Sequence, residues 1–108
     1  MKVWLDDVRP MPDKYTIHVT TAQEAISLLR TDTVTEISLD HDLGPIDECG
    51  TGYDVACFIE QRAVEGHKPP VTTLHTANPV GRQAMALALQ SAEKWYLETK
   101  RHEEDIDD

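Results

Sequence analysis

The sequence predicts a single α/β domain with about four mostly parallel strands and helices on both faces of the sheet. Three observations support this fold class. Short apolar segments recur along the chain, helical segments separate most of them, and the length of 108 residues is typical of one domain. Strands that alternate with helices of ten or more residues are joined by right-handed crossovers, and such connections give a parallel sheet.

Four segments are expected to form the strands. Residues 2–5 are a short apolar run that ends at a pair of aspartates, and residues 36–40 repeat this pattern with one aspartate at the end. Residues 16–20 and 71–74 are rich in β-branched side chains, which favour strands.

Two helices begin at capping patterns. Thr21 and Glu24 have capping-box spacing ahead of an amphipathic helix of about ten residues. Thr51 and Asp54 form a weaker capping pattern ahead of a second helix, which ends by Gly66.

The remaining segments follow from proline and glycine positions. Asn78 is an N-cap followed by a proline at the first helical position, which predicts a third helix that runs to about Lys100. Two prolines in residues 9–12 remove backbone donors, so the first crossover helix is expected to be missing or short. Residues 41–51 contain two glycines and a proline and are expected to form a loop.

The chain is acidic, with a formal net charge of −10. Five of these negative charges lie in residues 103–108, which are expected to form a solvated acidic tail after a domain of residues 1–102. Broad binding to a nucleic-acid backbone needs clustered lysine and arginine, and the composition argues against it.

We expect neither an export signal nor a membrane-spanning segment in this sequence. No apolar run approaches the ~20 residues that span a bilayer, and the first ten residues carry acids where a signal peptide is apolar. We therefore expect a cytoplasmic protein in which Cys49 and Cys57 stay reduced.

The ends of three strands carry the residues that suggest a function. In a parallel sheet, sites lie beyond the carboxyl ends of the strands, near the point where the strand order reverses. Polar residues that follow the first, third and fourth strands should therefore meet at one edge. They are Asp6, Asp7, Asp40, His41, Asp42, His75, Thr76 and Asn78.

A carboxylate cluster at one edge suggests a divalent cation. Two carboxylates ~4 Å apart repel by on the order of 4 kcal/mol at an effective dielectric of 20, and a hard cation relieves this repulsion. Oxygen ligands favour Mg²⁺, Mn²⁺ or Ca²⁺ over zinc, and we expect Mg²⁺ or Mn²⁺, with Asp6 or Asp7, Asp40 and the backbone carbonyl of Asp42 as the ligands. The competing interpretation is that polar residues simply follow strands in α/β loops.

Four further residues have two possible interpretations each. His41 and His75 are candidates for general acid or base, or are structural imidazoles held by hydrogen bonds. Arg9 can bind a phosphate or pair with one of the neighbouring aspartates. Asn78 caps its helix, and the start of that helix could receive a phosphate.

These residues resemble those of response-regulator receiver domains. Asp6 and Asp7 resemble the acidic pair, Asp40 the phosphoacceptor aspartate, and Thr76 the hydroxyl-bearing residue after the fourth strand. The resemblance implies a reduced receiver or flavodoxin-like three-layer sandwich. No fifth strand with the receiver lysine is evident in this chain.

The chain is more closely similar to the cyclic-phosphate-processing receiver-like family. The resemblance covers roughly residues 1–90. It implies an activity on RNA 2′,3′-cyclic phosphate ends or cyclic nucleotides. From the residues themselves we expect a metal-dependent phosphoesterase with Asp40 and His41 or His75 as catalytic residues and with Arg9, Thr76 or Asn78 at the phosphate. The alternative is a non-catalytic signalling or phosphate-binding module. The matching motifs are residues 5–10 (LDDVRP), 38–44 (SLDHDLG), 50–54 (GTGYD) and 75–79 (HTANP).

Overall fold

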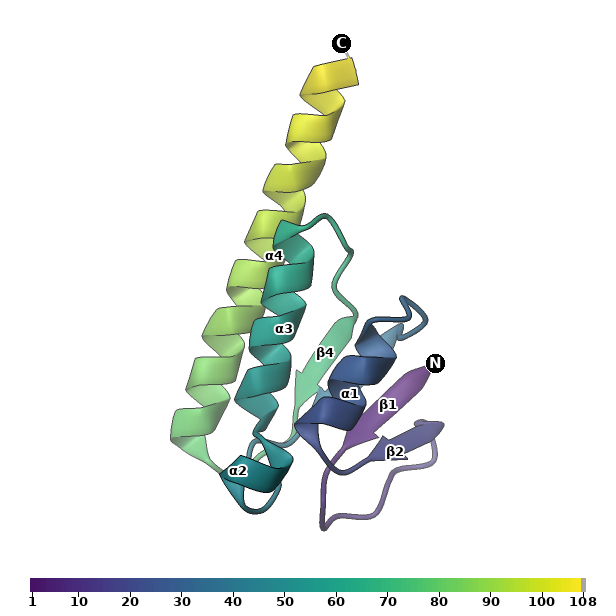
Figure 1. Ribbon diagram of the computed structural model, residues 1–108, viewed down its shortest axis with the longest axis vertical. Helices are drawn as coiled ribbons and strands as arrows, with labels where there is room; N and C mark the ends of the chain where they lie inside the picture. Colours follow the sequence, from purple (N-terminus) through teal and green to yellow (C-terminus); the bar gives the residue numbers. More distant parts are fainter. Residues whose placement is uncertain (108) are drawn as a thin grey trace.

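Four parallel strands form one sheet in the order β2-β1-β3-β4 (Figure 1). The computed structural model describes the backbone of residues 1–107 and the side chains of residues 1–103. The predicted parallel sheet is confirmed. The strands are β1 (Lys2–Leu5), β2 (Ile17–Val19), β3 (Glu36–Leu39) and β4 (Val71–Leu74).

The helices largely follow the predicted starts, with two differences in extent. They are α1 (Ala22–Leu29), α2 (Ile46–Cys49), α3 (Gly52–Val64) and α4 (Pro79–Asp107). The loop expected over residues 41–51 contains the short helix α2. Helix α4 runs on past the predicted end near Lys100, so part of the expected tail 103–108 is helical, while most of that tail's side chains lie outside the described residues.

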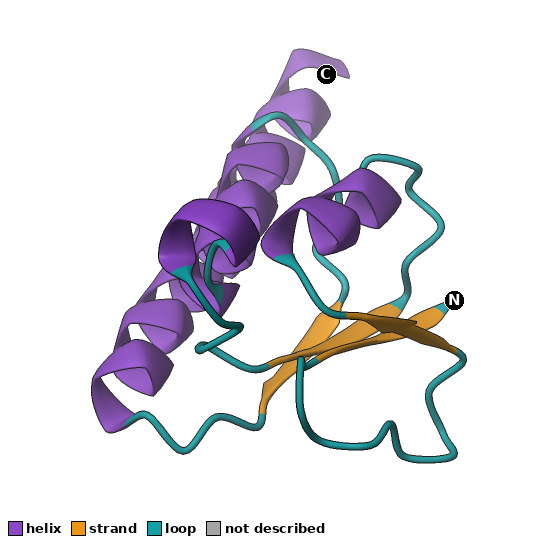
Figure 2. Ribbon diagram, turned by 60° about the horizontal axis from the view of Figure 1, so that its bottom comes forward, coloured by secondary structure: helices purple, strands orange, loops and turns teal. Residues whose placement is uncertain are grey.

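The predicted placement of helices on both faces of the sheet is wrong for the described residues. Helices α1, α3 and α4 lie on the same face, which gives two layers (Figure 2). The strand order explains this arrangement. The crossovers from β2 to β3 and from β3 to β4 run in the same direction across the sheet, so right-handed connections place their helices on one side. The connection from β1 to β2 runs the other way, and it contains no helix.

The core lies between the sheet and these helices. Val3 and Leu5 of β1 and Ile37 and Leu39 of β3 are fully buried against the helical layer. Burying each of these side chains contributes about 1.5–3 kcal/mol to the free energy of unfolding. Strands β1 and β3 are adjacent and parallel, with Val3 paired with Ile37 and Leu5 paired with Leu39. Because these paired side chains are buried together, the two strands end side by side.

The opposite face of the sheet is covered by part of the connection between β1 and β2. Trp4 pairs in register with Ser38, and both side chains are buried on this face. Tyr15 packs on Trp4 with ring centroids 5.2 Å apart, and its hydroxyl lies 3.5 Å from Thr73 Oγ1. The segment that replaces a crossover helix therefore shields the residues next to the strand ends.

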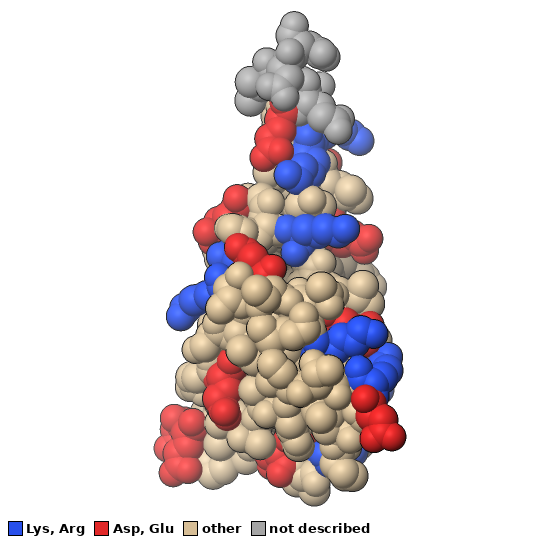
Figure 3. All heavy atoms as spheres, turned by 90° about the vertical axis from the view of Figure 1, so that its right-hand side faces the viewer, with Lys and Arg blue, Asp and Glu red and all other residues tan. Residues whose placement is uncertain are grey.

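Charged side chains are interspersed on the surface. On the face shown in Figure 3, acidic and basic side chains surround an uncharged central area, and no continuous basic surface is visible there. None of the helices in the described part of the chain is both long enough and apolar enough to cross a membrane.

Candidate functional site

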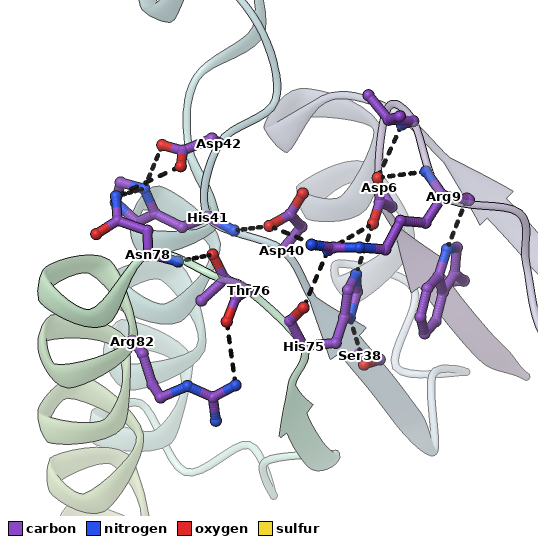
Figure 4. Close-up of polar contacts among 12 residues, drawn as sticks. Asp6, Arg9, Ser38, Asp40, His41, Asp42, His75, Thr76, Asn78 and Arg82 are labelled. Atoms are coloured by element: carbon purple, nitrogen blue, oxygen red, sulfur yellow. Dashed lines mark hydrogen bonds and ion pairs between the residues drawn. The ribbon is translucent and has the colours of Figure 1, made fainter.

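The carboxyl ends of three strands bring the predicted site residues together. Asp6 follows β1, Asp40 follows β3 and His75 follows β4 (Figure 4). One potential ligand atom from each of these residues lies within 4.8 Å of the others. The expectation that these strand ends converge agrees with this geometry.

Asp6 is a fully buried carboxylate whose two oxygens each accept two hydrogen bonds. Oδ1 accepts from the backbone N–H groups of Val8 (2.8 Å) and Arg9 (2.9 Å). Oδ2 accepts from His75 Nε2 (3.0 Å) and from Arg9 Nη1 (3.3 Å). Burial raises the pKa of Asp6, but the hydrogen bonds from Arg9, Val8 and His75 outweigh it, so the pKa lies below 3.8.

The guanidinium of Arg9 lies between the two carboxylates. Its Nη1 atom is 3.3 Å from Asp6 Oδ2 and 3.8 Å from Asp40 Oδ1. The same atom donates to the backbone carbonyl of His75 at 3.0 Å. Both interpretations of Arg9 therefore remain compatible with the structure, because it pairs with Asp6 while its side chain stays 45% exposed.

His75 is held on three sides by neighbours. Its ring stacks on Trp4, with centroids 3.8 Å apart and planes 7° apart. Ser38 Oγ lies 2.7 Å from Nδ1, and Asp6 Oδ2 lies 3.0 Å from Nε2. Burial lowers the pKa of His75 and outweighs the opposing effect of Asp6, so the neutral ring is favoured. Because Asp6 is ionised, the ring proton belongs on Nε2 and Ser38 donates to Nδ1.

Asp40 is mostly buried and keeps one oxygen available. Its Oδ1 accepts from the backbone N–H of His41 at 2.8 Å, and Oδ2 has no hydrogen-bond partner among the described residues. The start of α3 packs directly on this residue. A Cβ added at Gly52 would lie 2.0 Å from the Asp40 carbonyl oxygen, so only glycine fits there.

His41 and Asp42 form a separate pair beside the start of α4. His41 Nδ1 lies 2.9 Å from Asp42 Oδ1, and Asn78 Nδ2 lies 3.4 Å from Asp42 Oδ2 (Figure 4). The hydrogen bond from His41 is the main cause that lowers the pKa of Asp42. The His41 ring packs on Gly81, where an added Cβ would lie 2.5 Å from the ring. The Asp42 carboxylate is therefore turned away from Asp6 and Asp40.

Thr76 and Asn78 shape the turn that leads into α4. Asn78 caps the helix, since its Oδ1 accepts from Gly81 N at 3.0 Å. Thr76 Oγ1 accepts from Asn78 N at 3.1 Å, and the Thr76 carbonyl accepts from Arg82 Nη2 at 3.1 Å. The side chain of Asn78 is thus committed to the cap and to Asp42, while Thr76 stays at the site.

An open hollow of ≈ 390 Å³ lies over these groups. The exposed Asp7 lines it but makes no ion pair or side-chain hydrogen bond among the described residues. Neither His41 nor His75 is among the lining residues. The residues that line the hollow are Asp6, Asp7, Val8, Arg9, Asp40, Asp42, Gly44, Thr76 and Ala77.

Sequence reasoning missed three residues that support the site. Trp4 and Ser38 hold His75, and Arg82 fixes the backbone at Thr76. Ser38 carried a usable signal, because a serine inside an otherwise apolar buried strand needs a polar partner. Nothing in the pattern marked Trp4, since an aromatic residue in a strand fits an ordinary core.

A family model described as the cyclic-phosphate processing receiver domain matches residues 1–91. This match covers most of the chain and includes every site residue discussed above. Neither the comparison with curated proteins nor the comparison with solved structures finds a match.

Proposed function

This chain belongs to the cyclic-phosphate processing receiver family, and we propose that it is a phosphoesterase that opens cyclic phosphates with the help of Mg²⁺ or Mn²⁺. One observation carries the proposal. Two buried carboxylates, Asp6 and Asp40, share an arginine and face a hollow large enough for a phosphate ester. An RNA end with a 2′,3′-cyclic phosphate and a small cyclic nucleotide both present the anionic group that this hollow would take.

The donor atoms at the hollow fit a hard divalent cation. Asp6, Asp7 and Asp40 offer carboxylate oxygens, of which Asp40 Oδ2 and the Asp7 carboxylate have no partner among the described residues. Such oxygens suit Mg²⁺ or Mn²⁺ better than zinc. When bound, the cation neutralises the carboxylates and activates water toward phosphorus.

Arg9 and Thr76 are the residues of the chain placed to hold the phosphate. Arg9 is half-exposed at the hollow, and a guanidinium can donate two parallel hydrogen bonds to a phosphate. Thr76 lines the same hollow with Arg82 fixing its backbone. Asn78 acts on the phosphate only indirectly, because its side chain is used in capping α4.

We assign the proton transfer to His41. Hydrolysis of a cyclic phosphate forms a P–O bond from water and breaks the P–O bond to one ribose oxygen, so the water loses a proton and the leaving ribose oxygen gains one. Both ring nitrogens of His75 are occupied, by Ser38 and by Asp6. His41 does not line the hollow, but its Nδ1 lies 2.9 Å from Oδ1 of Asp42, which does, and its Nε2 has no hydrogen-bond partner among the described residues. The assignment therefore requires the leaving oxygen to lie on the Asp42 side of the hollow. His75 is then a positioning residue that holds Asp6.

Hydrolysis of 2′,3′-cyclic nucleotides with Mn²⁺ tests the proposal. Phosphorus NMR should show the cyclic ester signal replaced by that of a monoester for the wild type. Asp40→Asn and His41→Gln should each lose at least about 100-fold in rate, the lower range for a general acid or base. Asp47→Asn in α2 and His67→Gln, which lie outside the hollow, are matched controls.

Three results would count against the proposal. Equal background rates for the wild type and Asp40→Asn, on both mononucleotides and an RNA end, would exclude the reaction. Full activity in EDTA would exclude the cation. Saturable binding of cyclic nucleotide without turnover would favour a non-catalytic binding module.

A further inference from the structure

The hydrogen bonds of Asp6 leave no room for a cation unless one donor departs. A carboxylate has about four lone-pair positions. In Asp6 these are filled by Val8 N and Arg9 N at Oδ1 and by His75 Nε2 and Arg9 Nη1 at Oδ2. A cation coordinated by this carboxylate must therefore replace one of the four donors.

Only one of these donors can leave without disturbing the fold. The two backbone N–H groups belong to the turn that follows β1. His75 is fixed by its stack on Trp4 and its hydrogen bond to Ser38, and its side chain is only 16% exposed. The guanidinium of Arg9 makes polar contacts to Asp6, Asp40 and the His75 carbonyl and no cation–π contact among the described residues, and the Arg9 side chain is 45% exposed.

We propose that the Arg9 guanidinium is a built-in counter-ion that a divalent cation must displace from between Asp6 and Asp40. This inference rests on the proposed function, since it concerns the same cation position. Without a cation, Arg9 Nη1 relieves the repulsion between the two buried carboxylates from 3.3 Å and 3.8 Å. The cation and the guanidinium compete for the negative charge of the two carboxylates and for a coordination position on Asp6 Oδ2.

The exchange has a consequence for phosphate binding. Once displaced, the guanidinium loses its carboxylate partners in the hollow that it lines, and an anion there can take their place. Cation and phosphate should then bind cooperatively, and by linkage each should raise the affinity for the other by the same factor. Arg9 thus selects for a cation and a phosphate bound together over a cation alone.

Calorimetric titration with Mn²⁺ alone, using the full chain, tests the competition. Arg9→Gln should bind Mn²⁺ about 10-fold more tightly than the wild type, within the 5–150-fold range of typical couplings. Lys14→Gln is the matched control, since Lys14 pairs with Glu36 and its loss removes the same charge without touching the site. Adding inorganic phosphate should tighten Mn²⁺ binding several-fold in the wild type and not in Arg9→Gln.

A second measurement on the wild type avoids dependence on a variant. NMR of the Arg9 guanidinium, titrated with diamagnetic Mg²⁺, should show its side-chain N–H signals shifting as the carboxylate contacts are lost. Unchanged signals at saturating Mg²⁺, or Mn²⁺ binding to Arg9→Gln no tighter than to the wild type, would overturn the inference. If these results hold but no cyclic ester is hydrolysed, the counter-ion role stands and the phosphoesterase proposal fails. If neither the wild type nor Arg9→Gln binds a cation, the counter-ion role and the phosphoesterase proposal both fail.

Discussion

His75 lies flat on Trp4, with ring planes only 7° apart and centroids at 3.8 Å. Trp4 sits inside β1, and its indole N–H also donates to the Arg9 carbonyl at 3.3 Å. One buried aromatic residue therefore fixes the orientation of the imidazole and the backbone of the turn that carries the arginine. The stack explains why His75 points at Asp6 instead of into the hollow.

We expect Trp4→Ala to lower the free energy of unfolding by about 3–5 kcal/mol, the usual cost of removing a large buried aromatic side chain. Trp4→Phe keeps an aromatic surface for stacking and loses the hydrogen bond to the Arg9 carbonyl, so about 1 kcal/mol should be lost. Urea unfolding monitored by circular dichroism measures both values. A Phe variant as unstable as the Ala variant would show that stacking contributes little.

Stability should depend on pH through His75. Burial lowers the pKa of His75 in the folded chain below its ordinary value of 6.5, so the unfolded chain binds the proton more readily. The free energy of unfolding should therefore be at its full value above pH 6.5 and fall as the pH drops toward the folded-state pKa. Urea unfolding at several pH values in EDTA measures this slope.

His75→Gln is the comparison for this pH dependence. Its stability should change less than that of the wild type over the same window, because the titrating group is gone. Asp6 titrates below pH 3.8 and does not contribute to that window. Equal slopes for both proteins would assign the pH dependence to other groups.

Gly52→Ala should be strongly destabilising although it lies in a helix. Its Cβ would lie 2.0 Å from the Asp40 carbonyl oxygen and 2.9 Å from Met85 Sδ, and the backbone oxygen cannot move without shifting Asp40. We expect a loss of about 3 kcal/mol, at the upper end of overpacking costs. Gln61→Ala, an exposed position in the same helix, should stay within about 0.5 kcal/mol of the wild type in thermal unfolding.

The contact between Gly81 and His41 can be tested with a double-mutant cycle. Gly81→Ala alone should cost about 1–3 kcal/mol, because the new Cβ would lie 2.5 Å from the His41 ring. In a His41→Gly background, which removes the ring and also the His41 Cβ at 3.0 Å, the clash is absent, so the same change should stabilise by roughly 0.5–1 kcal/mol through helix propensity. An effect of the same sign in both backgrounds would contradict the packing of His41 on α4.

Much of the site follows from local sequence. Asp6 and Asp40 come directly after buried apolar strands, and parallel register brings adjacent strand ends to one edge. The caps at Thr51 and Asn78 are visible as residue patterns, and both form the expected hydrogen bonds. The caps depend on contacts between residues three positions apart, so the local segment specifies them. The meeting of Asp6 and Asp40 also needs the pairing of β1 with β3, which the alternation of strands and helices predicts.

The covering of the sheet was less predictable. The prolines after β1 correctly indicate a missing crossover helix, but the consequence for the layers depends on the strand order. Because β2 and β3 lie on opposite sides of β1, the connection from β1 to β2 runs across the sheet in the opposite direction to the later crossovers. A right-handed crossover helix in that connection would have covered the second face of the sheet. The segment next to β2 supplies Tyr15 there, packed on Trp4.

By itself, the sequence determined which acids and histidines reach the carboxyl edge of the sheet, because apolar burial fixes the strands and the strands fix their own ends. Only the tertiary structure decided which of these groups face one another. His75 turned to Asp6 through contacts with Trp4 and Ser38, 71 and 37 positions away. Asp42 turned toward Asn78, 36 positions away. The direction of a side chain beyond a strand end depends on partners that are distant in sequence, and no local pattern contains them.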